Sequence, residues 1–420
     1  MTASAFASLG LTPALVRAAA EQGYAEPTPI QAAAIPPSLQ GRDLVGCAPT
    51  GSGKTAAFGL ALLHRLATSP RPAWRRTDVL VLVPTRELAT QVGETLRALA
   101  SELVFPPKVA VLFGGVSLNP QMLGLRGGAE VVVATPGRLL DLVERNALKL
   151  GELKLLVLDE ADRLLDEGFA DELARIQALL PARRQNLFFS ATFAPAVQAL
   201  ADTLLHDPVR VEAAAAGDAS APAIEQRAVE VDTARRTPLL RHLLEQAGWP
   251  RVLVFVATRY ASEHVAEKLR RNGIAAAAFH GDLSQGARTR VLADLNSGAL
   301  RVLLATDMAA RGLHVAGLPV VVNYDLPRSA VDYTHRIGRT ARAGATGLAV
   351  SFVTAASEAH FRLIEKRQGQ RVSRERIAGF EPGEAAPAPS PPEGGIKGRR
   401  KSKKDKLREA ALSPPLAKPR

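Results

Sequence analysis

Short apolar runs alternate with segments of helical spacing over most of the chain. The run at 79–83 (VLVLV) has no polar alternation, which is typical of a strand buried on both faces. Similar apolar runs lie at 43–47, 109–113, 131–134, 155–158, 187–189, 228–231, 252–256, 275–279, 302–305, 320–323 and 348–352. Because helical patterns fall between most of these runs, the sequence predicts an α/β fold with parallel sheets.

The composition divides this pattern into two α/β units. A chain of 420 residues is long for one domain. Residues 212–223 are rich in alanine and almost lack large apolar side chains, as expected of a linker. We therefore expect a first domain at 1–213, a linker at 214–224, a second domain at 225–382 and a tail at 383–420. The tail is rich in Pro, Ala, Gly and charge, which predicts disorder.

The charge of the chain points to a polyanionic partner. The formal net charge is +12 and the isoelectric point is about 10.2. Residues 397–408 hold eight basic side chains and one acidic one, so more than half of the net charge lies in the tail. Such a tail would bind a nucleic-acid backbone without reading sequence, or would simply aid solubility.

The lone cysteine and the hydropathy of the chain bear on its location. Cys47 cannot form an internal disulfide, which fits a reducing compartment. No targeting segment or membrane-spanning run stands out, so we expect a cytoplasmic protein.

The segment 48–55 (APTGSGKT) has the features of a phosphate-binding loop. It joins an apolar run to a helical pattern, and backbone N–H groups in such a turn point at an anion. Lys54 would reach the β- and γ-phosphates of ATP, and the Thr55 hydroxyl would ligate Mg²⁺. Ala48 replaces the usual first glycine, and an ordinary glycine-rich turn is the alternative.

An acidic cluster follows the apolar run 155–158. Asp159 would ligate Mg²⁺, and Glu160 would orient or deprotonate the attacking water. The Ser190 and Thr192 hydroxyls follow the next apolar run and would reach Asp162 or Asp159. The alternative is a solvated acidic helix start.

Two further features suit ATP. Gln31, which follows Pro27 and Pro29, carries the donor and acceptor needed to read an adenine edge, and Phe6 would stack on the base. Arg336, Arg339 and Arg342 recur at every third residue, so on one element they would face the same side and need an anion such as the γ-phosphate. A plain turn and a basic surface stripe are the respective alternatives.

Together these motifs resemble those of the DEAD-box RNA helicases of superfamily 2, whose name the residues 159–162 (DEAD) spell. The resemblance covers roughly residues 5–382. It implies two tandem RecA-like domains with parallel sheets, with ATP and Mg²⁺ in the cleft between them. It also implies an RNA-dependent ATPase that separates RNA duplexes locally or remodels RNA–protein complexes.

The resemblance assigns roles to individual residues. Those for nucleotide binding are Phe6, Thr28, Gln31, Thr50, Gly51, Ser52, Gly53, Lys54 and Thr55. Those for catalysis are Lys54, Asp159, Glu160, Arg339 and Arg342, with Thr55 and Asp159 as metal ligands. Those for coupling are Asp162, Ser190, Thr192 and Asp307. Those for RNA binding, largely through sugar and phosphate and hence independent of sequence, are Pro84, Arg86, Gly115, Thr135, Arg138, Arg259, Gly281 and Thr306.

The sequence departs from the family pattern in places. His314 stands where the family usually has Asp, and Ala341 replaces a usual Gly in the arginine motif. The short N-terminus, the segment 379–382 (GFEP) and the basic tail resemble the bacterial RhlE-like group, for which ribosome or mRNA-decay assemblies are candidate partners. Three other classes stay open, namely a DNA translocase of the same superfamily, an RNA clamp that uses ATP only as a switch, and a small-molecule kinase.

Overall fold

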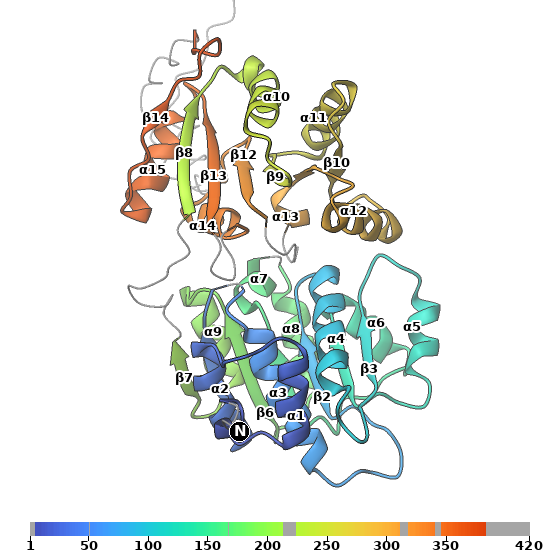
Figure 1. Cartoon of the computed structure of the whole chain (residues 1–420). Helices are drawn as coiled ribbons and strands as arrows, with labels where there is room; N and C mark the ends of the chain where they lie inside the picture. The colour runs from blue at the N-terminus through green and yellow to red at the C-terminus, as the bar shows by residue number, and fades with distance from the viewer. Residues whose placement is uncertain are drawn as a thin grey trace, which may run out of the picture.

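The protein contains two α/β units, each built on one parallel sheet. The computed structural model describes residues 5–49, 51–166, 168–212, 224–310, 318–340 and 346–383. In Figure 1 the second unit lies above the first, and the two face each other through the loops that follow their strands. The expected α/β class is therefore confirmed.

The first sheet has the strand order β3-β4-β2-β5-β6-β1-β7, and all of its pairs are parallel. Its strands are β1 (Leu44–Cys47), β2 (Val79–Leu82), β3 (Val109–Leu112), β4 (Val131–Ala134), β5 (Leu155–Leu158), β6 (Gln185–Ser190) and β7 (Val209–Glu212). Its helices are α1 (Pro13–Glu21), α2 (Pro29–Leu39), α3 (Lys54–Thr68), α4 (Arg86–Ala100), α5 (Leu118–Leu125), α6 (Pro136–Glu144), α7 (Ala161–Asp166), α8 (Ala170–Leu179) and α9 (Pro195–Leu204).

The second sheet repeats this architecture, in the order β10-β11-β9-β12-β13-β8-β14. Its strands are β8 (Ile224–Glu230), β9 (Val252–Phe255), β10 (Ala276–Phe279), β11 (Val302–Ala305), β12 (Val320–Asn323), β13 (Gly347–Val353) and β14 (Arg374–Glu375). Its helices are α10 (Arg236–Ala247), α11 (Arg259–Arg271), α12 (Gln285–Ser297), α13 (Asp307–Ala310), α14 (Ala330–Ile337) and α15 (Glu358–Gln368).

The inner strands are apolar throughout because helices cover both faces of each sheet. In β2, Val79 and Val81 pack into one core cluster, and Leu80 and Leu82 pack into the other. Every apolar run predicted as a strand is one. The strands β7 and β14 were not predicted, because charged residues interrupt β7 and make up all of β14. The other two edge strands, β3 and β10, are apolar and were predicted.

The predicted linker and tail lie almost wholly outside the described residues. Strand β7 ends at Glu212, and Ile224, the last residue of the predicted linker, is the first residue of β8. Of the predicted tail, only Gly383 is described; its N–H donates to the carboxylate of Asp232.

One buried carboxylate connects β1, which leads into the phosphate-binding loop, to its two neighbours β6 and β7. Asp43, at the start of β1, accepts hydrogen bonds from the Asn186 N–H (2.7 Å), the Asn186 Nδ2 (3.0 Å) and the His206 N–H (2.8 Å). Asn186 belongs to β6 and His206 precedes β7. The network therefore sets how β1 sits between its two neighbours.

We expect Asp43→Ala to lower the free energy of unfolding of the first domain by about 3 kcal/mol, because it leaves three donors without their charged acceptor. Urea unfolding followed by Trp74 fluorescence in a Trp249→Phe background would measure this. Glu144→Ala, which removes an exposed ion pair with Arg175, should change stability by less than about 0.5 kcal/mol. Equal midpoints for the two variants would contradict the prediction.

Candidate active site

The phosphate-binding loop is preformed at the carboxyl end of β1. Gly51 and Gly53 adopt φ of 83° and 96°, in the left-handed region that glycine tolerates. Lys54 is buried, and its Nζ donates to the Ala48 carbonyl at 2.6 Å. The Ser52 Oγ is buried with no hydrogen-bond partner. The loop thus presents unsatisfied polar groups and a desolvated cation, which suit an anion. Thr50 lies outside the described residues.

Gln31 braces this loop from the neighbouring helix α2. Its Oε1 accepts from the Thr28 N–H at 2.9 Å, and its Nε2 donates to the Gly53 carbonyl at 3.2 Å. A Cβ on Gly53 would lie 2.5 Å from Gln31 Nε2, so this contact requires glycine. One N–H and one lone pair of the Gln31 amide stay available for an adenine edge.

Phe6 lies elsewhere than expected. It is completely buried in the apolar core with Leu15 and Ile30. An apolar ring gains more from burial than from solvent contact, so this conformation offers no exposed face of Phe6 to a base.

The acidic cluster occupies the carboxyl end of β5, in a strained and desolvated setting. Asp159 is 2% exposed, and its Oδ1 accepts from the Glu160 N–H at 3.0 Å. Burial raises the pKa of Asp159 to about 7, although Lys54 acts in the opposite direction. Glu160 has a φ of 51°, which a residue with a side chain adopts at a cost in energy. Strain and desolvation at one place are typical of a functional site.

The coupling residues link the acidic cluster to β6, as expected in part. The Thr192 hydroxyl donates to Asp162 Oδ2 at 3.1 Å. The Ser190 hydroxyl instead donates to the Thr192 carbonyl at 2.8 Å, so it positions Thr192 rather than touching an acid. The two hydrogen bonds thus connect Asp162 to the segment that follows β6.

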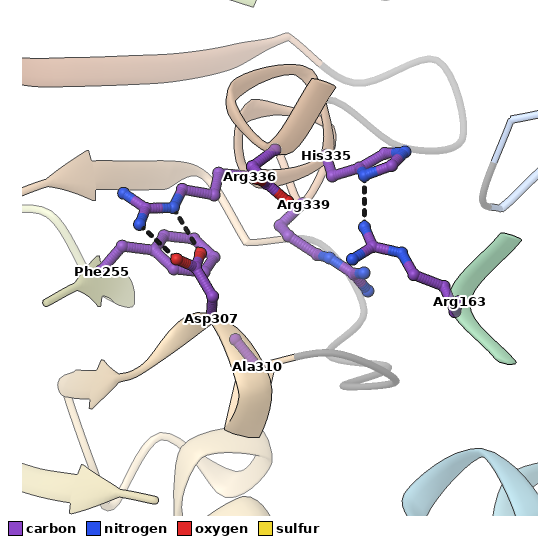
Figure 2. A pocket seen from close by; sticks show the side chains of 8 residues that line it. Arg163, Phe255, Asp307, Ala310, His335, Arg336 and Arg339 are labelled. Atoms are coloured by element: carbon purple, nitrogen blue, oxygen red, sulfur yellow. Dashed lines mark hydrogen bonds and ion pairs between the residues drawn. The ribbon is translucent and has the colours of Figure 1, made fainter. Parts of the chain in front are cut away.

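The arginine motif does not lie on one face of one helix. Helix α14 ends at Ile337, so Arg339 lies beyond its end. Arg336 is buried, bonded to both carboxylate oxygens of Asp307 at 2.6 and 2.7 Å, and stacked 4.8 Å from the Phe255 ring centroid (Figure 2). The expectation of three cations awaiting one anion is thus wrong for Arg336, because Asp307 neutralises it inside its own domain. Arg342, Ala341 and His314 lie outside the described residues.

Arg339 instead faces the first domain across a small cavity. The cavity, about 20 Å³, is lined by Arg163 of α7 together with Asp307, His335 and Arg339 of the second domain. Figure 2 shows Arg163 and Arg339 approaching from opposite sides, with Arg163 hydrogen-bonded to His335 Nδ1. Burial, together with the charge of Arg163, lowers the pKa of His335 to about 4. His335 is therefore neutral at pH 7, and its Nδ1 accepts this bond between the domains.

A second contact between the domains involves residues that sequence reasoning missed. Arg288 of α12 donates to Glu87 of α4 at 2.6 Å, with the two side chains 7% and 10% exposed. Arg288 also donates to the His280 carbonyl at 3.1 Å and lies 4.5 Å from the Phe279 ring centroid. The partners stand 201 residues apart in the chain. No local pattern could have paired them.

The predicted RNA contacts of the first domain gather on three adjacent strands. Arg86 follows β2, Gly115 follows β3, and Thr135 and Arg138 follow β4. A Cβ on Gly115, whose φ is 75°, would lie 2.0 Å from Arg86 Nη2, so glycine lets the guanidinium lie against the backbone. Arg138 is buried, its Nη2 donates to the Val116 carbonyl at 2.8 Å and its Nε forms an ion pair with Asp141 at 3.6 Å. Its Nη1 has no hydrogen-bond partner, which suits an incoming phosphate. Pro84 is buried and has no backbone N–H, so its carbonyl is the only polar group that it could offer to RNA.

In the second domain the matching residues follow β9, β10 and β11. They are Arg259, Gly281 and Thr306. Arg259 forms an ion pair with Asp282. The described chain therefore carries two rows of candidate RNA contacts, one on each side of the domain boundary.

No group of three or more His, Cys, Asp or Glu side chains among the described residues forms a metal cage. No described helix combines the length and the apolar character needed to cross a bilayer.

Comparisons with known proteins agree with this geometry. The pattern of the DEAD/DEAH box helicase family matches residues 28–200, and that of the helicase conserved C-terminal domain matches residues 235–344. The ATP-dependent RNA helicase DeaD of Mycobacterium tuberculosis is 44% identical over 384 residues, which are 90% of the chain and 66% of that relative. The chain thus spans just under two thirds of that relative.

Another relative and a solved structure extend the match. The ATP-dependent rRNA helicase rrp3 of Sclerotinia sclerotiorum is 42% identical over 350 residues, 83% of the chain and 71% of that protein. Dbp5 of S. cerevisiae, solved with RNA and ADP BeF3 bound, superposes with a TM-score of 0.78 at 30% identity. That match covers 89% of the chain and 96% of Dbp5, so both sheets and their arrangement are shared.

We expect Asp159→Asn to stabilise the protein in chelator without nucleotide, by up to about 4 kcal/mol at pH 7.5. The folded-state pKa lies above the unfolded value, so the wild type loses stability as pH rises from about 4 to about 7, whereas the variant does not. Thermal unfolding would be followed from pH 5 to pH 8. The difference in melting temperature between the variant and the wild type should widen as pH rises and then level off above about pH 7. The exposed change Asp171→Asn serves as the control. A gap that is constant with pH would contradict this cause.

We expect Arg288→Ala to separate the two domains, because removing one partner leaves Glu87 buried and uncompensated in the closed arrangement. Small-angle scattering should show that the radius of gyration of the variant exceeds that of the wild type by roughly several ångströms, because the two domains are no longer held together. Arg290→Ala, an exposed change on the same helix, should leave the curve unchanged. Superimposable curves for all three proteins would show that the pair does not hold the domains.

Proposed function

The chain belongs to the DEAD/DEAH box helicase family, and on this premise we propose that it is an ATP-dependent RNA helicase. One observation carries the proposal. Arg163 of the first domain and Arg339 of the second line one cavity at the domain boundary. Arg163 belongs to α7, which begins directly after Asp159 and Glu160, so groups suited to ATP hydrolysis come from both domains. Neither domain holds a complete site, so hydrolysis requires the two domains to close.

ATP is held mainly by the first domain. The backbone of 51–53 and the Lys54 ammonium bind the phosphates, and Gln31 meets the adenine edge through its free donor and acceptor. Thr55 and Asp159 would hold Mg²⁺, and the desolvated Asp159 carboxylate and unpartnered Ser52 hydroxyl fit a cation and phosphate at this edge. Bound Mg²⁺ would neutralise charge that develops on the β- and γ-phosphate oxygens.

Glu160 and the arginines complete the reaction. Glu160 orients a water in line with the γ-phosphorus and takes its proton as the new P–O bond forms and the bond to the β-phosphate oxygen breaks. Arg339, together with Arg342, stabilises charge on the transferring phosphoryl group from the second domain. Arg336 acts indirectly, because it anchors the motif to Asp307.

The two rows of RNA contacts explain why RNA would favour closure. A single strand lying across Arg86, Thr135 and Arg138 and then Arg259, Gly281 and Thr306 binds both domains at once. Contacts to sugar and phosphate position the strand without reading its bases, and contacts to the 2′-hydroxyl distinguish RNA from DNA. Closure that bends one strand would separate a duplex locally. The similarity of the chain to Dbp5, which was solved with RNA bound, supports the proposal that RNA binds across both domains.

Location, subgroup and cellular partners stay predictions from the sequence. They comprise a cytoplasmic site of action, membership of the RhlE-like group, and work in ribosome or mRNA-decay assemblies.

The deciding experiment is the steady-state ATPase rate without nucleic acid, with single-stranded RNA and with DNA of the same sequence. We expect stimulation of at least about tenfold by RNA alone, abolished in Lys54→Ala because the phosphates lose their cation.

Other outcomes identify the alternatives. Equal stimulation by DNA would indicate a DNA translocase. Duplex separation that survives in Glu160→Gln would indicate a clamp that uses ATP only as a switch. No stimulation by either nucleic acid would overturn the proposal.

A further inference from the structure

Tyr260 is an aromatic side chain that neither packing nor hydrogen bonding accounts for. It stands in the first turn of α11 and is 76% exposed. Its ring is stacked on His264, one helical turn further on, with centroids 5.4 Å apart and planes inclined by 12°. Among the described residues, none is hydrogen-bonded to its hydroxyl. One face of the ring is covered by the imidazole, and the high exposure leaves the other face to solvent.

Tyr260 lies at the edge of the second sheet that carries the proposed RNA contacts. Strand β11 stands between β10 and β9, so the loops after these three strands are neighbours. They supply Gly281 after β10, Thr306 after β11, and Arg259 and Tyr260 after β9. In Figure 1 α11 stands beside β9 and β10 on the outer side of this domain.

Two polar pairs clamp the start of α11 to the loop that carries Gly281. His280 Nε2 donates to Glu263 Oε1 at 2.9 Å, and Arg259 pairs with Asp282. One pair lies on each side of Gly281 in the chain. The first turn of α11, which carries Tyr260, is therefore joined to the loop of Gly281 at two points.

We propose that Tyr260, supported by His264, stacks on one unpaired base of the RNA strand that crosses the second domain. The inference rests on the proposed RNA-binding function and adds a base contact to a surface otherwise made of backbone contacts. An open aromatic face accepts any base, because every base has a π-face. It therefore adds affinity for unpaired RNA over paired RNA, whose bases are already stacked, without adding sequence preference.

The test uses the full chain with a non-hydrolysed ATP analogue and ten-nucleotide uridine RNAs. Each RNA carries one 2-aminopurine, placed at successive positions. In the wild type, the fluorescence of 2-aminopurine should be quenched most strongly at one position. Tyr260→Ala should restore fluorescence at that position alone and weaken binding about five- to tenfold, the lower part of the range for one stacked base.

Two further variants separate stacking from other causes. Tyr260→Phe should retain both quenching and affinity, because it keeps the ring and loses only the hydroxyl. His264→Ala should weaken both partially, because it removes the support of the ring. Leu363→Ala, an exposed apolar change on α15, serves as the matched control and should match the wild type.

The ATPase reaction gives an independent readout. Tyr260→Ala should raise the RNA concentration needed for half-maximal stimulation about as much as it raises Kd, with kcat at saturating RNA unchanged.

Two results would overturn the inference. One is Tyr260→Ala binding RNA as tightly as the wild type, with no position changed. The other is Tyr260→Phe losing as much affinity as Tyr260→Ala. Wild-type protein that binds the ATP analogue but no RNA would instead contradict the proposed function.

Discussion

Loss of water from charged groups at the boundary between the domains is the constraint on which this structure depends. Asp159, His335, Glu87 and Arg288 are all largely withdrawn from solvent, and each would be costly to bury alone. Each cost is met in a different way. Glu87 and Arg288 neutralise each other across the boundary, His335 stays uncharged, and Asp159 keeps a raised pKa that a bound cation would relieve.

The same logic explains why the arginines of one motif have unequal roles. Arg336 has its charge neutralised by Asp307 within the second domain, so it fixes the geometry of the loop that follows α14. Arg339, beyond the helix end, is directed at the first domain. Arg336 is thus a rigid anchor three residues before Arg339, and it positions the Arg339 cation at the boundary before ATP binds. Sites of phosphoryl transfer lower the reaction barrier mainly by preorganised charge of this kind.

Much of the fold and site could be predicted from the chain. Buried parallel strands are continuous apolar runs, and β2 and β5 are recognisable because helices cover both of their faces. The phosphate-binding loop and the acid after β5 were predictable because their chemistry needs particular residues at fixed local spacing. Strand β7 was not predicted because its exposed positions carry Arg210 and Glu212, which interrupt the apolar run.

What the sequence by itself determined is the class of fold, the motifs and the edge of each sheet on which they lie, since these follow from local periodicity and spacing. Only the tertiary structure decided which polar groups are partnered. It buried Phe6, directed Gln31 to Gly53, neutralised Arg336 with Asp307 and joined Glu87 to Arg288 across 201 residues. The physical reason is that desolvation and pairing depend on what surrounds a group in space, and a linear pattern records only its neighbours along the chain.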